Sequence, residues 1–162
     1  MPHSILPPKF LEPGAGLELI VMGGDRSTVK LASHETPDKF SLSEYTVLPQ
    51  NGPPLHVHER EDEVFYILEG EVNFWVNGKR VIAKPGACVF GARGTPHTFK
   101  NCSDKPARML LMVSPGANFE HFFSQVVARD THGKPPNEEA MIARIMSECP
   151  PHGMTILGPN PL

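Results

Sequence analysis

The sequence lacks the features of several large protein classes. Its three cysteines, Cys88, Cys102 and Cys149, form no C-x-x-C pair. An odd number without that spacing argues against a disulfide framework and a thiolate zinc site, so we expect buried or half-buried free thiols. No hydrophobic run reaches membrane-spanning length, and residues 1–16 lack the charged start and apolar core of a signal peptide. These absences predict a cytoplasmic protein with no membrane partner.

An excess of positive charge is also missing. The chain has 15 Lys and Arg against 18 Asp and Glu, a formal net charge of −3 and a pI near 6.2. Because nucleic-acid-binding domains cluster basic residues on one face, we expect no nucleic-acid partner. No internal repeat is visible, which argues against solenoids, propellers and two fused barrels.

Proline and glycine, by contrast, are abundant, with 18 and 14 of the 162 residues. Such a backbone turns often and cannot be mostly helical. The short apolar or alternating segments between the turns predict about nine strands, and Asn77-Gly78 is the strongest hairpin signal among the turns. These segments are 17–22, 28–32, 40–48, 64–68, 71–76, 79–83, 87–91, 97–101 and 107–113, and the chain also enters a strand at His56. Closely spaced strands without intervening helices predict an all-β protein with an antiparallel barrel.

We predict one domain over residues 1–162, with a barrel core at about 16–114 and a helical and Pro-rich extension at 115–162. The segment 117–128 carries apolar residues at the spacing of an amphipathic helix. They are Phe119, Phe122, Phe123, Val126 and Val127. A second helix is predicted from a cap at Asn137 to a stop before Pro150, and the tail 158–162 is expected to be extended on the surface.

Four residues carry the chemistry. His56 and His58 alternate along one strand, so both imidazoles point to the same face. Glu63 shares the parity of Phe65 and therefore heads an inward-facing apolar row. His97 comes from a later strand, and inward positions of separate strands can meet in a small barrel. We expect three imidazoles and a carboxylate to face one cavity.

An apolar barrel would make such a cluster unstable without a partner. Burying the carboxylate alone costs on the order of several kcal/mol, whereas metal binding can contribute roughly 10 kcal/mol or more to folding. The quartet therefore predicts one divalent transition metal per chain, held by His56, His58, Glu63 and His97. Fe, Ni, Mn, Co, Cu and Zn are all compatible with these ligands. The charged run 59–62 beside Glu63 is expected to be a solvated turn.

These residues resemble the two motifs of the cupin superfamily. The first motif is present as His56-x-His58, four residues, Glu63, six residues and Gly70, with its opening glycine displaced to Gly52. The second is present as Gly86, Gly94, His97 and Asn101, with Ala92 where the family has proline. All four ligand positions are intact. The layout is similar to single-domain cupins described as quercetin 2,3-dioxygenase-like.

The resemblance implies a cupin-type jelly roll, or double-stranded β-helix. It also implies a metal-dependent dioxygenase that acts on a small phenolic or enolic, flavonol-like substrate with O2, with Glu63 as the base that takes the substrate's proton. One alternative is a metal-bearing module that binds or senses a small molecule without turnover. Another is a sugar isomerase or epimerase, which would need several inward basic residues.

The sequence also predicts a homodimer. The N-terminal hairpin and the apolar residues Phe119, Phe122 and Phe123 offer more apolar surface than one small barrel needs.

Overall fold

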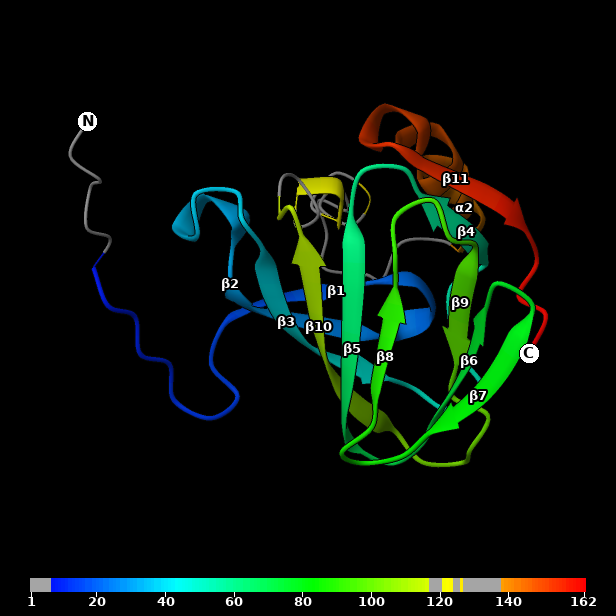
Figure 1. The fold of residues 1–162 in the computed structure, drawn as a ribbon, viewed down its shortest axis with the longest axis horizontal. Coiled ribbons are helices and arrows are strands. Elements are labelled where there is room, and N and C mark those ends of the chain that lie inside the picture. The colour runs from blue at the N-terminus through cyan, green and yellow to red at the C-terminus, as the bar shows by residue number, and fades with distance from the viewer. Residues whose placement is uncertain (1–6, 117–120, 124–125, 127–137) are drawn as a thin grey trace.

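Two antiparallel sheets build the protein in the computed structural model, which describes residues 7–116, 121–123, 126 and 138–162 (Figure 1). Among these residues there are eleven strands. The six-stranded sheet has the order β1 (Leu17–Ile20), β2 (Arg26–Leu31), β3 (Ser41–Val47), β10 (Ala107–Ser114), β5 (Asp62–Glu69) and β8 (Cys88–Gly91). The five-stranded sheet has the order β11 (Met154–Gly158), β4 (Leu55–His58), β9 (His97–Lys100), β6 (Val72–Val76) and β7 (Lys79–Ala83).

The core lies between the inner faces of the two sheets. In β3 and β10 every second residue is buried, which is the alternation expected where one face of a sheet packs inward. Three phenylalanines join the sheets, since the Phe65 ring lies 5.1 Å from that of Phe74 and 5.7 Å from that of Phe99. The predicted antiparallel β-barrel architecture is confirmed.

The turn sequences behave as their chemistry requires. Asn77 and Gly78 have φ values of 45° and 85°, and they join Val76 directly to its partner Lys79. Two successive residues with positive φ form the tight hairpin turn that matches strand twist. The N-terminal hairpin is also present, with β1 and β2 linked through the 3-10 turn η1 (Met22–Gly24). A further 3-10 turn, η2 (Ser33–Glu35), precedes β3.

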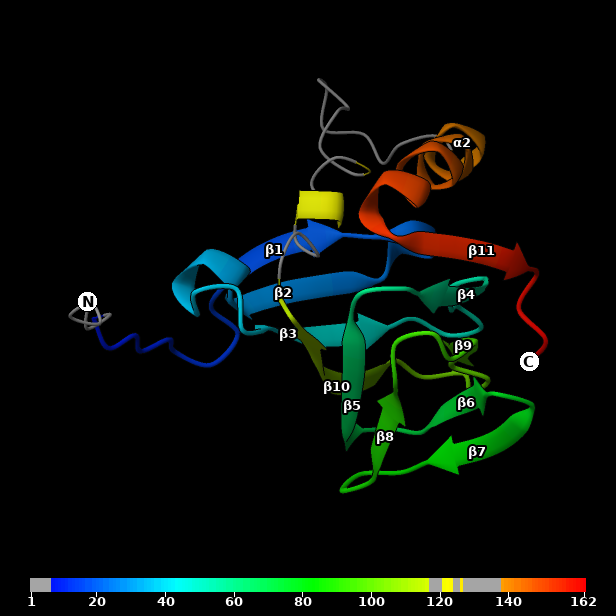
Figure 2. The same cartoon turned by 45° about the horizontal axis from the view of Figure 1, so that its top comes forward.

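The C-terminal part covers one end of the barrel (Figure 2). The predicted second helix is α2 (Glu138–Glu148), followed by the 3-10 turn η3 (Pro150–His152) and β11. Within the first predicted helix, residues 121–123 and 126 are helical, and the remaining positions, Phe119 and Val127 included, lie outside the described residues. The buried cluster at this end consists of Phe122, Val126, Met141, Cys149 and Met154.

The strand β11 was not predicted. It pairs with β4, so that Met154 lies opposite His58 and Ile156 opposite His56. A short segment with one glycine and nearby prolines has too weak a pattern to indicate a strand, and the neighbouring strand decides its conformation. The division into a barrel core at 16–114 and an extension at 115–162 stays a proposal, with β11 as the strand that the extension adds.

The cysteine prediction was wrong for two of the three thiols. Cys149 is buried, whereas Cys88 and Cys102 are exposed. Cys88 lies on the edge strand β8 opposite Tyr66, a residue that is itself 43% exposed. No helix among the described residues is long and apolar enough to cross a membrane.

Candidate metal centre

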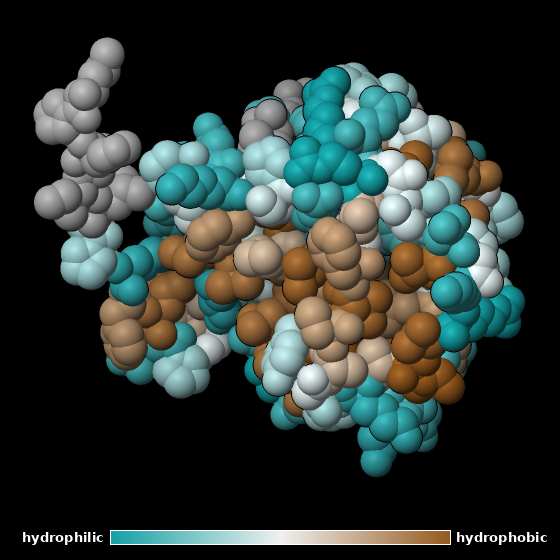
Figure 3. Space-filling model, viewed as in Figure 1, coloured by the Kyte–Doolittle hydropathy of each residue, from teal (hydrophilic) through white to brown (hydrophobic). Residues whose placement is uncertain are grey.

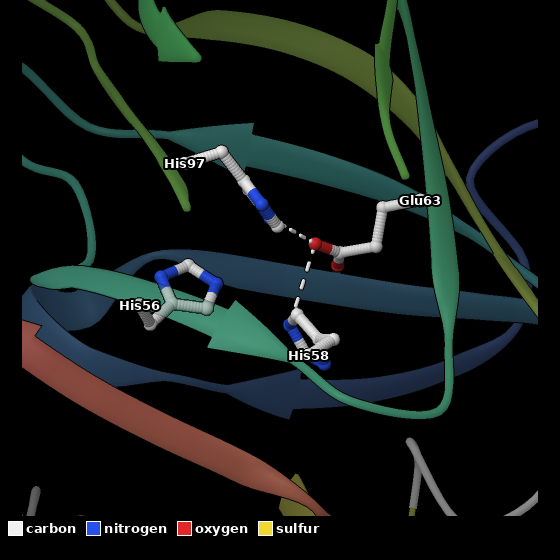
Figure 4. Close-up of side chains that lie close together, drawn as sticks. All are labelled: His56, His58, Glu63 and His97. Atoms are coloured by element: carbon white, nitrogen blue, oxygen red, sulfur yellow. Dashed lines mark hydrogen bonds and ion pairs between the residues drawn. The ribbon is translucent and has the colours of Figure 1, made fainter. Parts of the chain in front are cut away.

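The structure brings the four predicted residues together. His56 and His58 come from β4, Glu63 from the start of β5 and His97 from the first position of β9 (Figure 4). His56 and His97 are direct partners in the sheet, which places the two imidazoles side by side. One nitrogen or oxygen atom from each of the four residues lies within 4.8 Å of those of the other three.

Backbone carbonyls fix two of the rings. The Nδ1–H groups of His56 and His97 donate to the carbonyl oxygens of Pro54 and Thr95, both at 2.8 Å. A carbonyl oxygen only accepts, so Nδ1 carries hydrogen and Nε2 remains as the ligand atom of each ring. The Nε2 atoms of His97 and His58 lie 2.6 Å and 3.4 Å from Oε2 of Glu63.

The carboxylate is ionised although it is only 3% exposed. Burial acts to raise the pKa of Glu63, but His58 and the hydrogen bond from His97 outweigh burial and bring that pKa to about 2. Burial also opposes the charge on His97, yet its hydrogen bond to Glu63 leaves the pKa of His97 raised. Burial, together with the neighbouring His58 and His97, lowers the pKa of His56 to about 4, so this ring is neutral near pH 7.

The donor set fits a transition metal. Ligand atoms about 2.0–2.2 Å from a metal lie at most roughly 4.4 Å apart, so the 4.8 Å cluster needs a contraction of a few tenths of an ångström. Three neutral imidazoles and a carboxylate suit first-row divalent ions, and four protein ligands leave coordination positions for substrate. These residues could hold one metal ion, which would replace the proton that His97 shares with Glu63.

Two neighbours of the quartet were missed. Glu61 was expected in a solvated turn but is 7% exposed, with its Oε2 3.6 Å from Nδ1 of His58. A carboxylate that accepts a hydrogen bond from a ligating imidazole orients the ring, but this contact is longer than a hydrogen bond. A Cβ on Gly91 would lie 3.3 Å from the ring of His97, so glycine leaves the ring its space. Neither residue stands out by spacing in the sequence.

A cavity of about 90 Å³ opens onto His56, His58 and Glu63. Its walls are mostly apolar, and the C-terminal part of the chain supplies much of the lining. Representative apolar lining residues are Val21, Phe99, Leu111, Phe122, Ile145 and Ile156. Asp25 and Tyr45 also line the cavity, and no motif or spacing in the sequence marks either of them as functional.

Comparisons with known proteins agree with this architecture. The cupin domain family matches residues 43–113. The chain is 30% identical over 121 residues to the quercetin 2,3-dioxygenase of Bacillus subtilis, covering 72% of this chain and 34% of that protein. It is 37% identical over 65 residues to an oxalate-binding protein of Thermotoga maritima, covering 40% of this chain and 54% of the relative.

A solved structure adds a match over about two thirds of this chain and most of the other. The polyketide cyclase RemF of Streptomyces resistomycificus has 26% sequence identity and a TM-score of 0.59, with 67% of this chain and 80% of that chain covered. The chain carries a cupin domain, matched over residues 43–113, and its two sheets form the cupin jelly roll. It spans 34% and 54% of the lengths of the two curated relatives named above.

Proposed function

We propose that the chain is a metal-dependent dioxygenase that acts on a small phenolic or enolic substrate, flavonol-like in its chelating oxygens, with O2. The observation that carries this proposal is the convergence of His56, His58, Glu63 and His97 beside an apolar cavity, which the first three of these residues line. A bound transition metal supplies Lewis-acid and redox chemistry at such a site. The similarity to a quercetin 2,3-dioxygenase supports oxygen chemistry.

The residues of the chain take distinct roles in this proposal. His56, His58, His97 and Glu63 hold the metal, and Glu63 also accepts the proton of the substrate hydroxyl as catalytic base. Its low pKa keeps it ionised near pH 7. Apolar walls such as Phe99 and Leu111 pack against the substrate ring and exclude water from the carboxylate.

Oxygen uptake by metal-loaded protein tests the proposal. Purified protein should contain close to one transition-metal ion per chain by elemental analysis, and it should consume O2 with a member of a panel of phenols, enols and diketones. At full metal loading, Glu63→Gln should lower the rate by at least about a hundredfold, because proton transfer contributes roughly 10²–10⁴-fold. The exposed Glu59→Gln is the matched control and should keep the parent rate.

A non-catalytic binding module is the second candidate, and the similarity to an oxalate-binding protein favours it. Both candidates use the same four residues and the same cavity. Metal-loaded protein that binds a panel compound tightly yet consumes no O2 with any of them would replace the dioxygenase by this module. A Glu63→Gln variant that is as active as the parent would instead make Glu63 a ligand without a role as base.

A sugar isomerase or epimerase ranks last. Such an enzyme grips a phosphorylated or nucleotide-linked sugar with basic side chains. Among the described residues that line the cavity there is no lysine or arginine. The lining is mostly aromatic and aliphatic, which suits a ring better than a charged sugar.

We also propose a homodimer. Phe122 and Phe123 contribute to the cavity lining, so they do not form the proposed dimer interface. Phe119 lies outside the described residues. Apolar side chains gather instead over β10, β5 and β8, with hydrophilic residues around them (Figure 3). Tyr66 and Phe90 on this face are 43% and 56% exposed. A second copy of the chain would cover them.

Light scattering at micromolar concentration should therefore give twice the chain mass. Phe90→Glu should shift the mass to that of the monomer, whereas Ile142→Glu, a 46% exposed residue on α2, should leave it unchanged. A monomeric parent protein would contradict this proposal. A cytoplasmic location likewise stays a prediction, which fractionation of the producing cells tests.

A further inference from the structure

A second polar group lies in the cavity beside the candidate metal centre. Among the described lining residues outside the quartet, Asp25 and Tyr45 are the only two with a carboxylate or a hydroxyl group. Asp25 closes the turn between β1 and β2, and Tyr45 points inward from β3. They are 1% and 6% exposed.

The surrounding chain holds both side chains in place. Oδ1 of Asp25 accepts a hydrogen bond from the backbone N–H of Leu48 at 2.8 Å. The side chains of Asn51 and Tyr45 hydrogen bond to the same carboxylate. The Tyr45 ring meets Phe99 edge-on at 5.8 Å, which fixes its direction.

A structural role alone does not account for an acid at this position. The donors from Leu48, Asn51 and Tyr45 need acceptor lone pairs, and an asparagine oxygen would supply two of these without charge. Burial raises the pKa of Asp25 to about 6, so the carboxylate is kept at a cost in stability near pH 7. Buried ionisable groups that line a largely apolar cavity are typical of ligand sites.

The free donors and acceptors of Asp25 and Tyr45 determine which ligand group these two side chains can bind. The Tyr45 hydroxyl donates its hydrogen to Asp25, since this bond favours the charged carboxylate. The hydrogen-bonding positions that remain free on Asp25 and Tyr45 are therefore oxygen lone pairs, which only accept. A hydroxyl or N–H on the ligand fits them, whereas a ketone or an ether oxygen does not.

We propose that Asp25 and Tyr45 form a second subsite, which accepts a hydrogen bond from a hydroxyl of a substrate whose enol or phenol oxygen lies at the metal centre. This inference rests on the proposed function for the metal end of the ligand. The cavity of about 90 Å³ is below the roughly 300–1,000 Å³ of common ligand pockets. The substrate class is thus a single apolar ring with a chelating enol and a second, separate hydroxyl group.

Two pyranones that differ in one hydroxyl group test the subsite. Allomaltol and kojic acid present the same hydroxy-ketone to a metal, but kojic acid carries a hydroxymethyl group where allomaltol has methyl. Calorimetry on the full chain loaded with Zn²⁺ should show that kojic acid binds roughly tenfold more tightly, as a hydrogen bond to a charged group allows. Tyr45→Phe should bring this ratio to about one and leave the affinity for allomaltol unchanged.

The other tyrosine of the chain provides the matched control. Tyr66→Phe makes the same change on the outer face of β5 and should keep the parent ratio. Asp25→Asn, which retains an acceptor for Leu48, is the second variant and should also lower the ratio. Equal binding of the two probes by the parent would overturn the inference, and so would a Tyr45→Phe variant that weakens both probes alike.

The Zn²⁺-loaded assay separates this inference from the proposed dioxygenase, because it involves neither O2 nor turnover. A parent protein that prefers kojic acid but consumes no O2 would support the subsite and contradict the dioxygenase. A parent protein that consumes O2 with panel substrates but does not prefer kojic acid over allomaltol would support the dioxygenase and contradict the subsite.

Discussion

Glu63 and Phe65 are successive inward residues of β5, and they are buried to nearly the same extent, at 3% and 1% exposure. Phe65 packs against Phe74 and Phe99 and is stabilised by removal of apolar surface from water. Glu63 is stabilised by the histidines that face it, chiefly His58 and His97. One strand thus crosses from a region where burial is favourable to one where burial must be offset by partners.

The contrast separates the part of the barrel that provides stability from the part that carries the candidate metal centre. At the apolar end, around Phe65, packing depends on the volume and shape of the side chains. At the polar end, around Glu63, stability depends on particular donor and acceptor atoms at particular distances. Asp25 belongs to the polar end as well, because burial raises its pKa in the same cavity. Changes at the two ends should therefore differ in their dependence on metal and pH.

The largest effect is expected at the apolar end. Phe65→Ala should lower the free energy of unfolding by about 3–5 kcal/mol, the range for deletion of a buried phenylalanine ring. The loss should be the same at pH 5 and pH 8, because the ring does not titrate. Urea unfolding at the two pH values measures it, and a loss below about 1 kcal/mol would show that the apolar end tolerates a cavity.

The gain in stability on metal addition should depend on the ligands at the polar end alone. Ni²⁺ at a thousandfold excess over its dissociation constant should stabilise the parent by about 4 kcal/mol, by mass action on the folded state. His97→Ala should lose most of this gain, since one of the four proposed ligands is missing. Thermal unfolding with and without Ni²⁺ measures it, with the exposed His34→Ala as control. An equal gain in the His97 and His34 variants would contradict the proposed site.

Asp25 should give a smaller, pH-dependent effect. Its pKa is raised from 3.8 to about 6, so between these values the unfolded chain loses the proton first and the stability of the parent falls as pH rises. Asp25→Asn removes this loss. At pH 7.5 the variant should be more stable than the parent by at most roughly 3 kcal/mol, and the gain should vanish below pH 4.

Denaturant titrations from pH 3.5 to 8 compare the parent, Asp25→Asn and the exposed Asp104→Asn. The Asp104 variant should follow the parent at every pH. An Asp25 variant whose stability relative to the parent does not change with pH would show that the carboxylate is not destabilised by burial.

The smallest effect is expected one residue before Glu63. Asp62 makes an ion pair with Arg93 at 2.7 Å, but both side chains are exposed to solvent, at 29% and 50%. Screening by water weakens such pairs. Asp62→Asn should leave urea unfolding and metal affinity within experimental error of the parent, whereas a measurable loss of metal would show that this turn positions Glu63.

Much of the fold could be predicted because its signals are local. Asn77-Gly78 fixes a hairpin by its own backbone preferences, and the alternation in β3 and β10 needs only one buried face. The quartet could be predicted as well, since parity along β4 and β5 decides which way side chains point. Glu61 could not, because a carboxylate in a charged run has no spacing that distinguishes a buried position from a solvated one.

The sequence alone determined the antiparallel barrel, the turns and the convergence of His56, His58, Glu63 and His97, because strand parity and turn chemistry act over a few residues. Only the tertiary structure decided that β11 pairs with β4, that the C-terminal part lines the cavity, and that Asp25 and Tyr45 face it together with His56, His58 and Glu63. These contacts join segments far apart in the chain. Packing of the whole molecule sets them, and no local pattern encodes it.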